Sequence, residues 1–299
     1  MKKLFAIASI VLFASLAHAQ VTKLDSLSNW KKSFKAGLNL NQASFSSNWK
    51  AGGVNSLGFN TFLNYKAGYK KDKISWDNEF DLQYGMVNNQ GQGYRKTLDR
   101  IYFDTKVGKT MSAKWDMFVA LNFQTQFTKG YKYTKNATGI ETAELISNLF
   151  APAFITTSIG FQYTQSPAFK VRLSPFAPRV TIVQNSDQLA VVDPISPYGV
   201  LIGESVRYEW LAGQILAEFN KDIAKNVNLK WRYLMFVNYE NLNFKEIDHR
   251  LDLNLTAKVN QFVNVSLGGI MLYDFDQDSG LQVSQAFSLG MLYTIQNFK

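Results

Sequence analysis

Apolar and polar residues alternate one by one along residues 55–86, with a single interruption at the polar sequence YKKDK. Before the interruption, every second residue from Leu57 to Tyr65 is apolar or threonine, and most second residues from Ile74 to Met86 repeat the pattern. Successive side chains of a strand point to opposite faces, so the alternation predicts two strands, each with an apolar and a polar face. Both run to about ten residues or more, beyond the usual five or six.

The turn between these two strands decides which polar residues face one another. A turn centred on residues 70–71 places Asn64 opposite Asp77 and Asn60 opposite Asp81. The opening hairpin would then carry a row of acidic and amide side chains on its polar face.

The same alternation recurs and predicts twelve strands in all, joined by short turns near residues 70, 111, 166, 223 and 261. Longer loops lie near residues 48, 91, 140, 191, 244 and 278. Short turns at one end and long loops at the other are typical of bacterial outer-membrane barrels. The fold class is therefore all-β, a single antiparallel transmembrane β-barrel of about twelve strands. The expected strands cover residues 34–40, 57–65, 74–86, 100–107, 115–127, 155–163, 169–173, 211–219, 227–237, 250–259, 265–273 and 283–293.

Two stretches interrupt the regular pattern. Pro175 and Pro178 follow the strand that starts at Phe169, and because proline removes a ladder donor, a bulge or an early exit from the wall is expected there. In the longest loop, residues 128–152, apolar residues from Ile140 to Leu149 approach helical spacing and predict a short loop helix.

The first residues have the layout of a secretory signal. A positive Met1–Lys3 precedes an apolar Leu4–Leu16, and Ala17–Ala19 fits a small-x-small cleavage site. The apolar run is shorter than the ~20 residues that a transmembrane helix needs. We therefore expect export to the bacterial outer membrane. The expected division is a signal peptide at 1–19, a periplasmic N-terminal lead at 20–32 and the barrel at 33–299.

Composition narrows the chemistry. The formal charge is +9, and the basic residues are scattered rather than gathered into the stripe that nucleic-acid binding needs, so no nucleic-acid partner is expected. The chain has no cysteine, which excludes disulfides and thiolate sites. After removal of the signal only His249 remains, so no metal site and no cofactor are expected.

In a membrane barrel the apolar face contacts lipid and the polar face lines the lumen. Charges of both signs on the polar faces favour this arrangement over a soluble barrel. Aromatic residues lie at the strand ends nearest the short turns, where an interfacial girdle belongs. They are Tyr65, Trp76, Trp115, Tyr163, Phe169, Phe219 and Tyr293.

Polar-face residues are the candidates for lining the lumen. Two interpretations stay open: a pore whose separated acidic and basic walls orient polar solutes, or an ion-pair network that simply fills a small barrel. The candidates are Asn60, Asn64, Asp77, Glu79, Asp81, Arg100, Asp104, Lys106, Arg172, Lys230, Arg232, Arg250, Asp252 and Lys258.

Short motifs spread along nearly the whole chain resemble an uncharacterised β-barrel family, a domain of unknown function, of Bacteroidota outer membranes. The resemblance implies location and fold and brings no activity. The motifs are Asn48-Trp49-Lys50, Gly52-Gly53, Asn55-Ser56, Trp76-Asp77-Asn78, Tyr84-Gly85, Arg95-Lys96-Thr97, Asp99-Arg100, Thr125-Gln126-Phe127, Gly130-Tyr131, Ala151-Pro152-Ala153, Ser174-Pro175, Tyr198-Gly199-Val200, Lys258-Val259-Asn260 and Tyr273-Asp274.

The sequence leaves three functions open. The first is a channel for small polar solutes through a charged lumen. The second is an enzyme that acts on lipid or lipopolysaccharide at the outer rim, which would need a serine within reach of His249; no serine motif accompanies that residue, and the sequence does not decide whether the chain is an enzyme. The third is a structural or adhesion barrel with a plugged lumen. The expected partners are outer-membrane lipid, lipopolysaccharide and a small polar solute.

Overall fold

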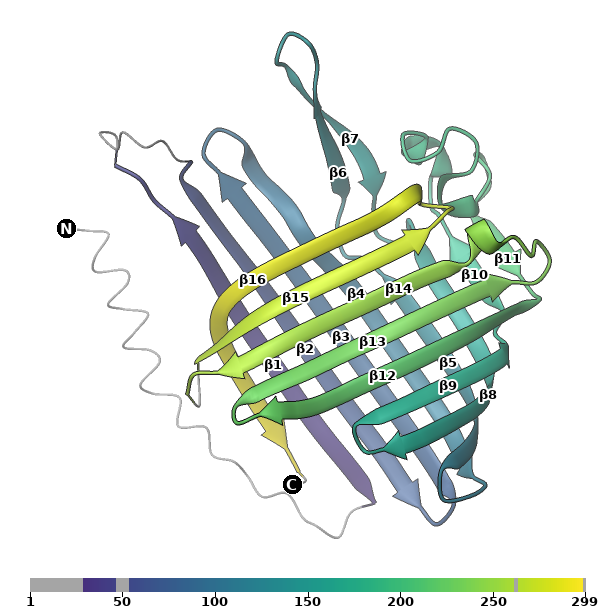
Figure 1. The fold of residues 1–299 in the computed structure, drawn as a ribbon. Helices are drawn as coiled ribbons and strands as arrows, with labels where there is room; N and C mark the ends of the chain where they lie inside the picture. The colour runs from purple at the N-terminus through teal and green to yellow at the C-terminus, as the bar shows by residue number, and fades with distance from the viewer. Residues whose placement is uncertain (1–28, 47–53, 261–262, 298–299) are drawn as a thin grey trace.

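The computed structural model describes residues 29–46, 54–260 and 263–297. They form a closed antiparallel β-barrel with twelve strand positions around its wall, which confirms the predicted fold class (Figure 1). The first and last strands pair with each other and close the barrel. The wall strands are β1 (Trp30–Ala43), β2 (Ser56–Lys71), β3 (Ile74–Asn89), β4 (Gly93–Thr110), β5 (Trp115–Thr125), β8 (Ala153–Ser166), β9 (Phe169–Phe176), β12 (Ala212–Ala224), β13 (Val227–Asn238), β14 (Asp248–Lys258), β15 (Val263–Asp274) and β16 (Asp278–Gln296).

Further elements lie at the end of the barrel that carries the long loops. They are β6 (Gly130–Lys135), β7 (Glu141–Ser147), β10 (Arg179–Ile182), β11 (Val206–Glu209) and the short 3-10 helices η1 (Ser186–Leu189), η2 (Pro197–Gly199) and η3 (Phe244–Glu246). Within the described residues, no helix is long and apolar enough to cross a membrane.

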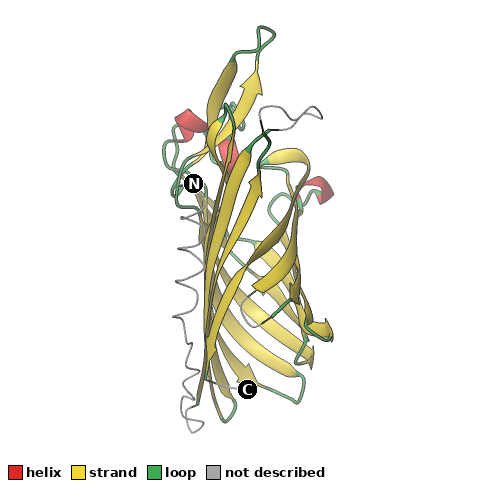
Figure 2. Ribbon diagram, turned by 90° about the vertical axis from the view of Figure 1, so that its left-hand side faces the viewer, coloured by secondary structure: helices red, strands yellow, loops and turns green. Residues whose placement is uncertain are grey.

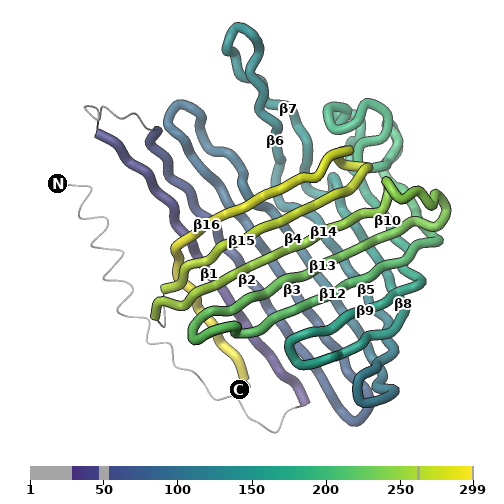
Figure 3. The backbone as a smooth tube through the Cα atoms, in the orientation of Figure 1, coloured from purple at the N-terminus to yellow at the C-terminus, as the bar shows by residue number. Residues whose placement is uncertain are grey.

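The strands are strongly tilted. In Figure 3 the strands β12 to β16 run in front and cross the direction of β1 to β5, which form the wall behind. The short turns gather at one end, where β1 also begins and β16 ends, because Ser33 pairs with Gln296. The long loops and the projecting β6–β7 hairpin gather at the other end (Figure 2). The predicted asymmetry of short turns and long loops is therefore present.

The opening hairpin consists of β2 and β3, each of 16 residues. Its turn lies at residues 72–73, where Asp72 adopts a left-handed conformation with φ of 52° that aspartate tolerates better than most residues. The predicted turn centre at 70–71 was wrong, and so was the register: Asn64 faces Asp81 and Asn60 faces Gly85. Moving the turn by two residues moves every cross-strand partner by four and keeps the same faces inside.

The proline pair produces the predicted bulge. The chain leaves the regular ladder after Phe176 and rejoins it at Arg179, with β10 continuing along the strand β8 that β9 already pairs with. The facing strand is interrupted in the same way: β11 pairs with β10, and β12 pairs with β9. The register is the same on both sides of the interruption, with Arg179 opposite Glu209 and Ser174 opposite Gln214. Each pair therefore acts as one long interrupted strand, and the barrel keeps twelve wall positions.

Gly160 makes this bulge sterically feasible. A Cβ built on Gly160 would lie 2.0 Å from the Leu173 carbonyl oxygen, a backbone atom that cannot move aside cheaply. We expect Gly160→Ala to lower the free energy of unfolding by about 1–3 kcal/mol through overpacking. Urea titration of the refolded barrel would measure this. Gly269→Ala is the matched control, because nothing lies within 4 Å of a Cβ there, and an equal loss in both variants would contradict the steric explanation.

Two further expectations need correction. Residues 140–149 do not form a helix: β6 and β7 make a hairpin whose turn contains Gly139 at φ of 81°. The Asn136 side chain accepts hydrogen bonds from the Thr138 and Ile140 amides, which stabilises the turn and favours a hairpin over the apolar spacing. The barrel also begins at Trp30 rather than at residue 33, because Trp30 already pairs with Tyr69.

The outward face of the wall is apolar. Its exposed side chains include Leu57, Val107, Val119, Leu253 and Leu289 on five different strands. Large apolar residues exposed all round a closed barrel have no protein partner to cover them, as a lipid-facing surface requires. The protein is thus a transmembrane β-barrel with an apolar outer face and a polar interior.

Candidate functional site: the charged lumen

The inward positions carry the charged residues. All the candidates named from the sequence lie on the inward sides of β2, β3, β4, β9, β13 and β14. Side chains on this side contact one another across the interior of the barrel. The clearest cross-barrel contact joins Arg172 on β9 to Asp104 on β4, with Nη1 at 3.1 Å from Oδ1 and 3.2 Å from Oδ2. Both side chains are more than nine-tenths buried.

Four more ion pairs lie in the lumen, three between neighbouring strands and one within β14. Glu79 and Asp77 of the acidic row on β3 bind Lys66 at 3.1 Å and Lys106 at 3.0 Å. On the other side of the barrel, Lys170 binds Glu218 at 3.1 Å and Arg250 binds Asp252 at 2.8 Å. Opposite charges are therefore interleaved rather than gathered on separate walls. Of the two interpretations that the sequence left open, this arrangement is closer to the ion-pair network than to separate acidic and basic walls.

The charges in the lumen are nevertheless not evenly neutralised. On β13 and β14 the inward side carries Lys230, Arg232, Arg250 and Lys258 against two carboxylates: Asp252, which Arg250 binds, and Asp248, which Arg179 binds. Asp81 on β3 accepts hydrogen bonds from the amides of Asn64 and Gln83 rather than from a cation. Positive charge is thus in excess on the β13–β14 side.

The middle of the lumen holds a small cavity of about 30 Å³, room for roughly two or three water molecules. Charged and amide side chains from both sides of the barrel surround it, with Tyr102 on one side and Leu234 on another. The lining residues are Arg100, Tyr102, Asp104, Asn122, Gln124, Gln214, Arg232, Leu234, Arg250 and Asp252.

Tyr102 is the important residue that was not among the sequence candidates. It is 3% exposed, and its ring lies 4.4 Å from the guanidinium carbon of Arg100 and 4.5 Å from that of Arg232. Arg232 also donates a hydrogen bond to the Tyr102 hydroxyl. The sequence could have identified Tyr102 as a lumen residue, because it lies between Arg100 and Asp104 on the same polar face of one strand.

Lys66 and Gln162 were missed as well. Lys66 lies on the inward side of β2, and Gln162 on β8 accepts a hydrogen bond of 2.7 Å from Lys106. Gln162 stands within an otherwise apolar and hydroxyl-rich strand, so its alternation offered no charged neighbour to mark it. β8 comes within reach of β4 because both strands pair with β5, one on each side.

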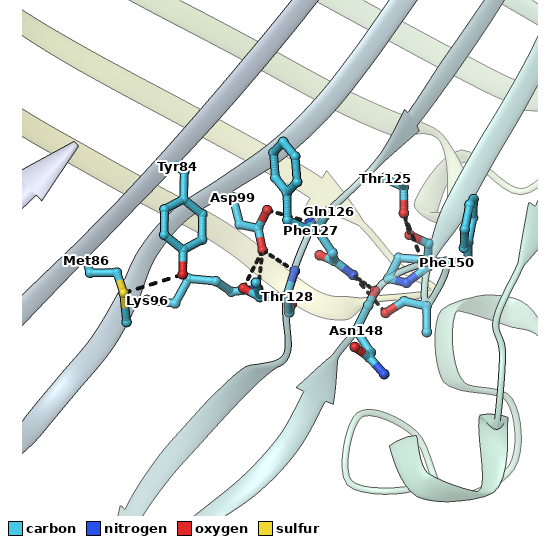
Figure 4. Close-up of polar contacts among 12 residues, drawn as sticks. Tyr84, Met86, Lys96, Asp99, Thr125, Gln126, Phe127, Thr128, Asn148 and Phe150 are labelled. Atoms are coloured by element: carbon cyan, nitrogen blue, oxygen red, sulfur yellow. Dashed lines mark hydrogen bonds and ion pairs between the residues drawn. The ribbon is translucent and has the colours of Figure 1, made fainter. Parts of the chain in front are cut away.

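Asp99 anchors the outer end of β4 to the longest loop (Figure 4). Its carboxylate accepts hydrogen bonds from the backbone amides of Phe127 at 2.7 Å and Thr128 at 3.0 Å, and from Lys96 at 2.8 Å. Nearby, the Gln126 amide donates to the carbonyl oxygens of Asn148 and Ala151, both at 2.8 Å. These bonds fix both ends of the segment that carries the β6–β7 hairpin.

The loop between β10 and β11 folds into a compact cap. Val183, Leu189 and Val200 are almost fully buried and pack against Ala151 and Tyr198. The cap also sits against an ion pair near the β15–β16 turn, in which Arg207 lies 2.5 Å from Asp276. Burial acts to lower the pKa of Arg207, but the carboxylates of Glu209 and Asp276 outweigh it and raise that pKa.

The Tyr198 hydroxyl donates a hydrogen bond of 2.5 Å to the Ile146 carbonyl oxygen and so ties the cap to β7. Burial, and then the Asp274 charge, raises the pKa of Tyr198, so this hydroxyl stays protonated well past neutral pH. The stability that the protonated hydroxyl contributes is present below the unfolded-state pKa of about 10 and is lost as the pH rises through the folded-state pKa.

We expect Tyr198→Phe to lower the free energy of opening the cap by about 1 kcal/mol, because the hydrogen bond to Ile146 is lost. Hydrogen exchange of the 183–205 amides should speed up, while wall amides on β2 and β3 serve as the internal control.

The predicted aromatic girdle residues lie near the short turns. Trp115 and Tyr163 contact each other at 5.1 Å between ring centroids. The Trp231 ring on β13 lies 5.8 Å from the Phe219 ring on the neighbouring strand β12 and 5.9 Å from the Phe169 ring on β9, one strand further along the wall. Tyr65, Trp76 and Tyr293 are each about 40% exposed on the outward face. The interfacial role of these residues stays a prediction.

His249 lies on the outward side of β14, in a stack with Tyr233 and Tyr273. Its Nδ1 shares a hydrogen bond of 2.8 Å with the Tyr233 hydroxyl. Among the described residues, no serine makes a hydrogen bond with His249, and no group of three or more histidine, cysteine or acidic side chains is arranged to hold a metal ion. The described geometry offers no specific observation in favour of the lipid enzyme.

These features define a class: a twelve-stranded transmembrane β-barrel of the outer-membrane type with a charged lumen. Residues 40–131 match the model of a family described as "Protein of unknown function (DUF3078)". The match confirms, over this part of the chain, the resemblance to an uncharacterised family. It covers the end of β1 and all of β2 to β5, and it includes Asp99, Arg100, Tyr102, Asp104 and Lys106.

No curated protein matches the chain. Solved structures with detectable likeness include the translocator domain of the autotransporter NalP from Neisseria meningitidis, at 7% identity, TM-score 0.39 and coverage of 97% of each chain. The COG4313 outer membrane channel from Pseudomonas putida F1 is 8% identical, with TM-score 0.39 and coverage of 94% of this chain and 99% of that one. The NanC porin is 8% identical, with TM-score 0.40 and coverage of 87% and 98%. Likeness of this degree does not extend to activity.

Proposed function

We propose that the protein is an outer-membrane channel that passes small polar solutes through a narrow, charge-lined lumen. One observation carries the proposal: the central lumen contains cations that no carboxylate of the described residues pairs with. Arg100 has a buried Nε without a hydrogen-bond partner. A packed, structural lumen would leave such a charge costly, because a buried ion must be paired or hydrated. Hydration or a passing solute would supply the missing partners.

The membrane arrangement that fits this function follows from the two ends of the barrel. The chain is exported through its N-terminal signal, the short turns and both ends of the wall face the periplasm, and the long loops face outward. The apolar outer face contacts the lipid, and the outer rim contacts lipopolysaccharide. The cap over the β10–β11 end and the narrow central cavity favour a small solute over a large one.

Planar-bilayer recording and liposome flux measurements test the channel. We expect discrete conductance steps from the refolded protein and uptake of small polar solutes, with size exclusion sharper than that of wider porins. Folding is verified by heat-modifiable gel mobility, which distinguishes the closed barrel from the unfolded chain. A folded barrel that shows neither conductance nor solute flux would contradict the proposed channel function.

A second candidate is supported by the β6–β7 hairpin, which projects beyond the rest of the barrel (Figure 1). Its base is held by Asp99, and Arg95 both pairs with Glu141 at 2.6 Å and lies 4.1 Å from the Tyr133 ring. A rigid, aromatic projection suits adhesion to a partner. Replacing residues 131–145 by a short Gly-Ser turn should abolish partner cross-linking on cells and leave the barrel folded; unchanged cross-linking would contradict an adhesive role of the hairpin.

A further inference from the structure

Two guanidinium groups in the central lumen share a tyrosine instead of a carboxylate. Arg100 and Arg232 both contact the ring of Tyr102, at 4.4 Å and 4.5 Å from their central carbons. Across the described residues, neither makes an ion pair with an acidic side chain. Arg232 places one donor on the Tyr102 hydroxyl. Because each guanidinium carries five N–H donors, most of their hydrogen-bonding capacity remains free.

The charge around the cavity is unbalanced. Arg100, Arg232 and Arg250 line it together with Asp104 and Asp252. Asp104 is already bound by a further guanidinium, that of Arg172, and Asp252 is bound by Arg250. Among the lining residues, three guanidiniums face two carboxylates, an excess of one positive charge. Like charges repel more strongly in a partly dehydrated interior than in water, so an anion at this point would relieve the repulsion.

Neutral donors complete the surroundings. The Tyr102 hydroxyl accepts from Arg232, so its own hydrogen is available to another acceptor. The side-chain amides of Gln124 and Gln214 also line the cavity. The planar fork of an arginine matches the paired oxygens of a carboxylate or a phosphate, and such charge-assisted bonds are about twice as strong as neutral ones.

We propose that Arg100, Tyr102 and Arg232 form a binding site for the oxyanion group, carboxylate or phosphate, of a small solute. Arg250 adds positive potential, while the Arg172–Asp104 pair fixes the wall behind the site. The inference rests on the proposed channel in one respect, because the solute reaches the site along the lumen. Binding itself does not require conduction.

Isothermal titration of the barrel, refolded in detergent micelles, tests the site. Sodium acetate and sodium phosphate are titrated separately at constant ionic strength, with glucose as the neutral comparison. We expect saturable binding of at least one of the two anions and none of glucose. Which anion binds distinguishes a carboxylate site from a phosphate site.

Substitutions locate the binding. Arg100→Gln and Arg232→Gln should each weaken the affinity by about tenfold, the effect of losing one charged hydrogen-bond partner. Arg100→Lys should lose part of this, because it keeps the charge and loses the fork. The matched control is Lys132→Gln on β6, which removes the same charge outside the lumen and should leave binding unchanged.

Every outcome is decisive for the site. Absence of saturable anion binding by the wild-type barrel overturns it, as does equal weakening in Lys132→Gln. If a glutamine variant fails the heat-modifiability check, the wild-type titrations and the Arg100→Lys variant decide. Anion binding without conductance would support the binding site and contradict the channel function. Conductance without anion binding would support the channel function and contradict the binding site.

Discussion

Arg172→Ala is expected to lower the free energy of unfolding by about 3–5 kcal/mol, the largest loss among the substitutions considered for this barrel. The change leaves the Asp104 carboxylate, which is 9% exposed, without its guanidinium partner inside the lumen wall. It also removes the Arg172 side chain from its position 5.9 Å from the Phe118 ring. Urea-induced unfolding in phospholipid vesicles, followed by tryptophan fluorescence, would measure the loss.

Two comparisons show whether burial of the pair is the cause. Lys170 lies two residues away on the same inward side of β9, but it is 41% exposed in its pair with Glu218. Lys170→Ala should therefore cost no more than about 1 kcal/mol. The double variant Arg172→Met with Asp104→Leu removes both charges and should recover most of the stability. A loss for Arg172→Ala as small as that for Lys170→Ala would mean that water reaches Asp104.

Leu253→Arg is expected to destabilise the barrel by about 2–4 kcal/mol in a lipid bilayer. Leu253 is the central residue of the 11-residue strand β14 and points outward between Trp231 and Gly269 on the neighbouring strands. An arginine there would place its charge at the depth where the bilayer solvates it least. The same substitution on the water-exposed surface of a soluble barrel would have almost no effect, so the measurement tests the lipid contact directly.

Thr256→Arg is the control for this prediction. Thr256 lies on the same strand with its side chain on the inward side, between Asn228 and Ser266, and neither neighbour carries a charge. Its arginine would enter the aqueous lumen, and we expect a change below about 0.5 kcal/mol. Equal destabilisation by both substitutions would contradict the assignment of the two faces.

The opening hairpin shows why the faces were predictable and the register was not. Alternation has a period of two, so it assigns Asn64 and Asp81 to one face whatever the turn position. The turn itself depends on a single left-handed residue, Asp72, within a run of lysines and aspartate that offers several equivalent turn sites. An error of two residues in the turn exchanged the partner of Asn64 from Asp77 to Asp81.

The projecting β6–β7 hairpin shows a second limit. Apolar spacing over 140–149 is compatible with a short helix or a strand, because so short a segment covers less than three helical turns. Two sets of hydrogen bonds favour the hairpin: the Asn136 side chain accepts from the Ile140 amide in the turn, and the Asp99 carboxylate accepts from the Phe127 amide at the base. The Asp99 contacts join residues that are far apart in sequence, and no local pattern announces them.

By itself, the sequence determined the strand number, the alternation of short turns and long loops, the bulge at Pro175 and Pro178, and the face on which each charge lies. These properties follow from local geometry, because side-chain direction and proline chemistry act over one or two residues. Only the tertiary structure decided which charges meet. Arg172 reaches Asp104, and Arg232 reaches Tyr102 while Arg100 keeps no acidic partner, because the closed wall brings together strands that are distant along the chain.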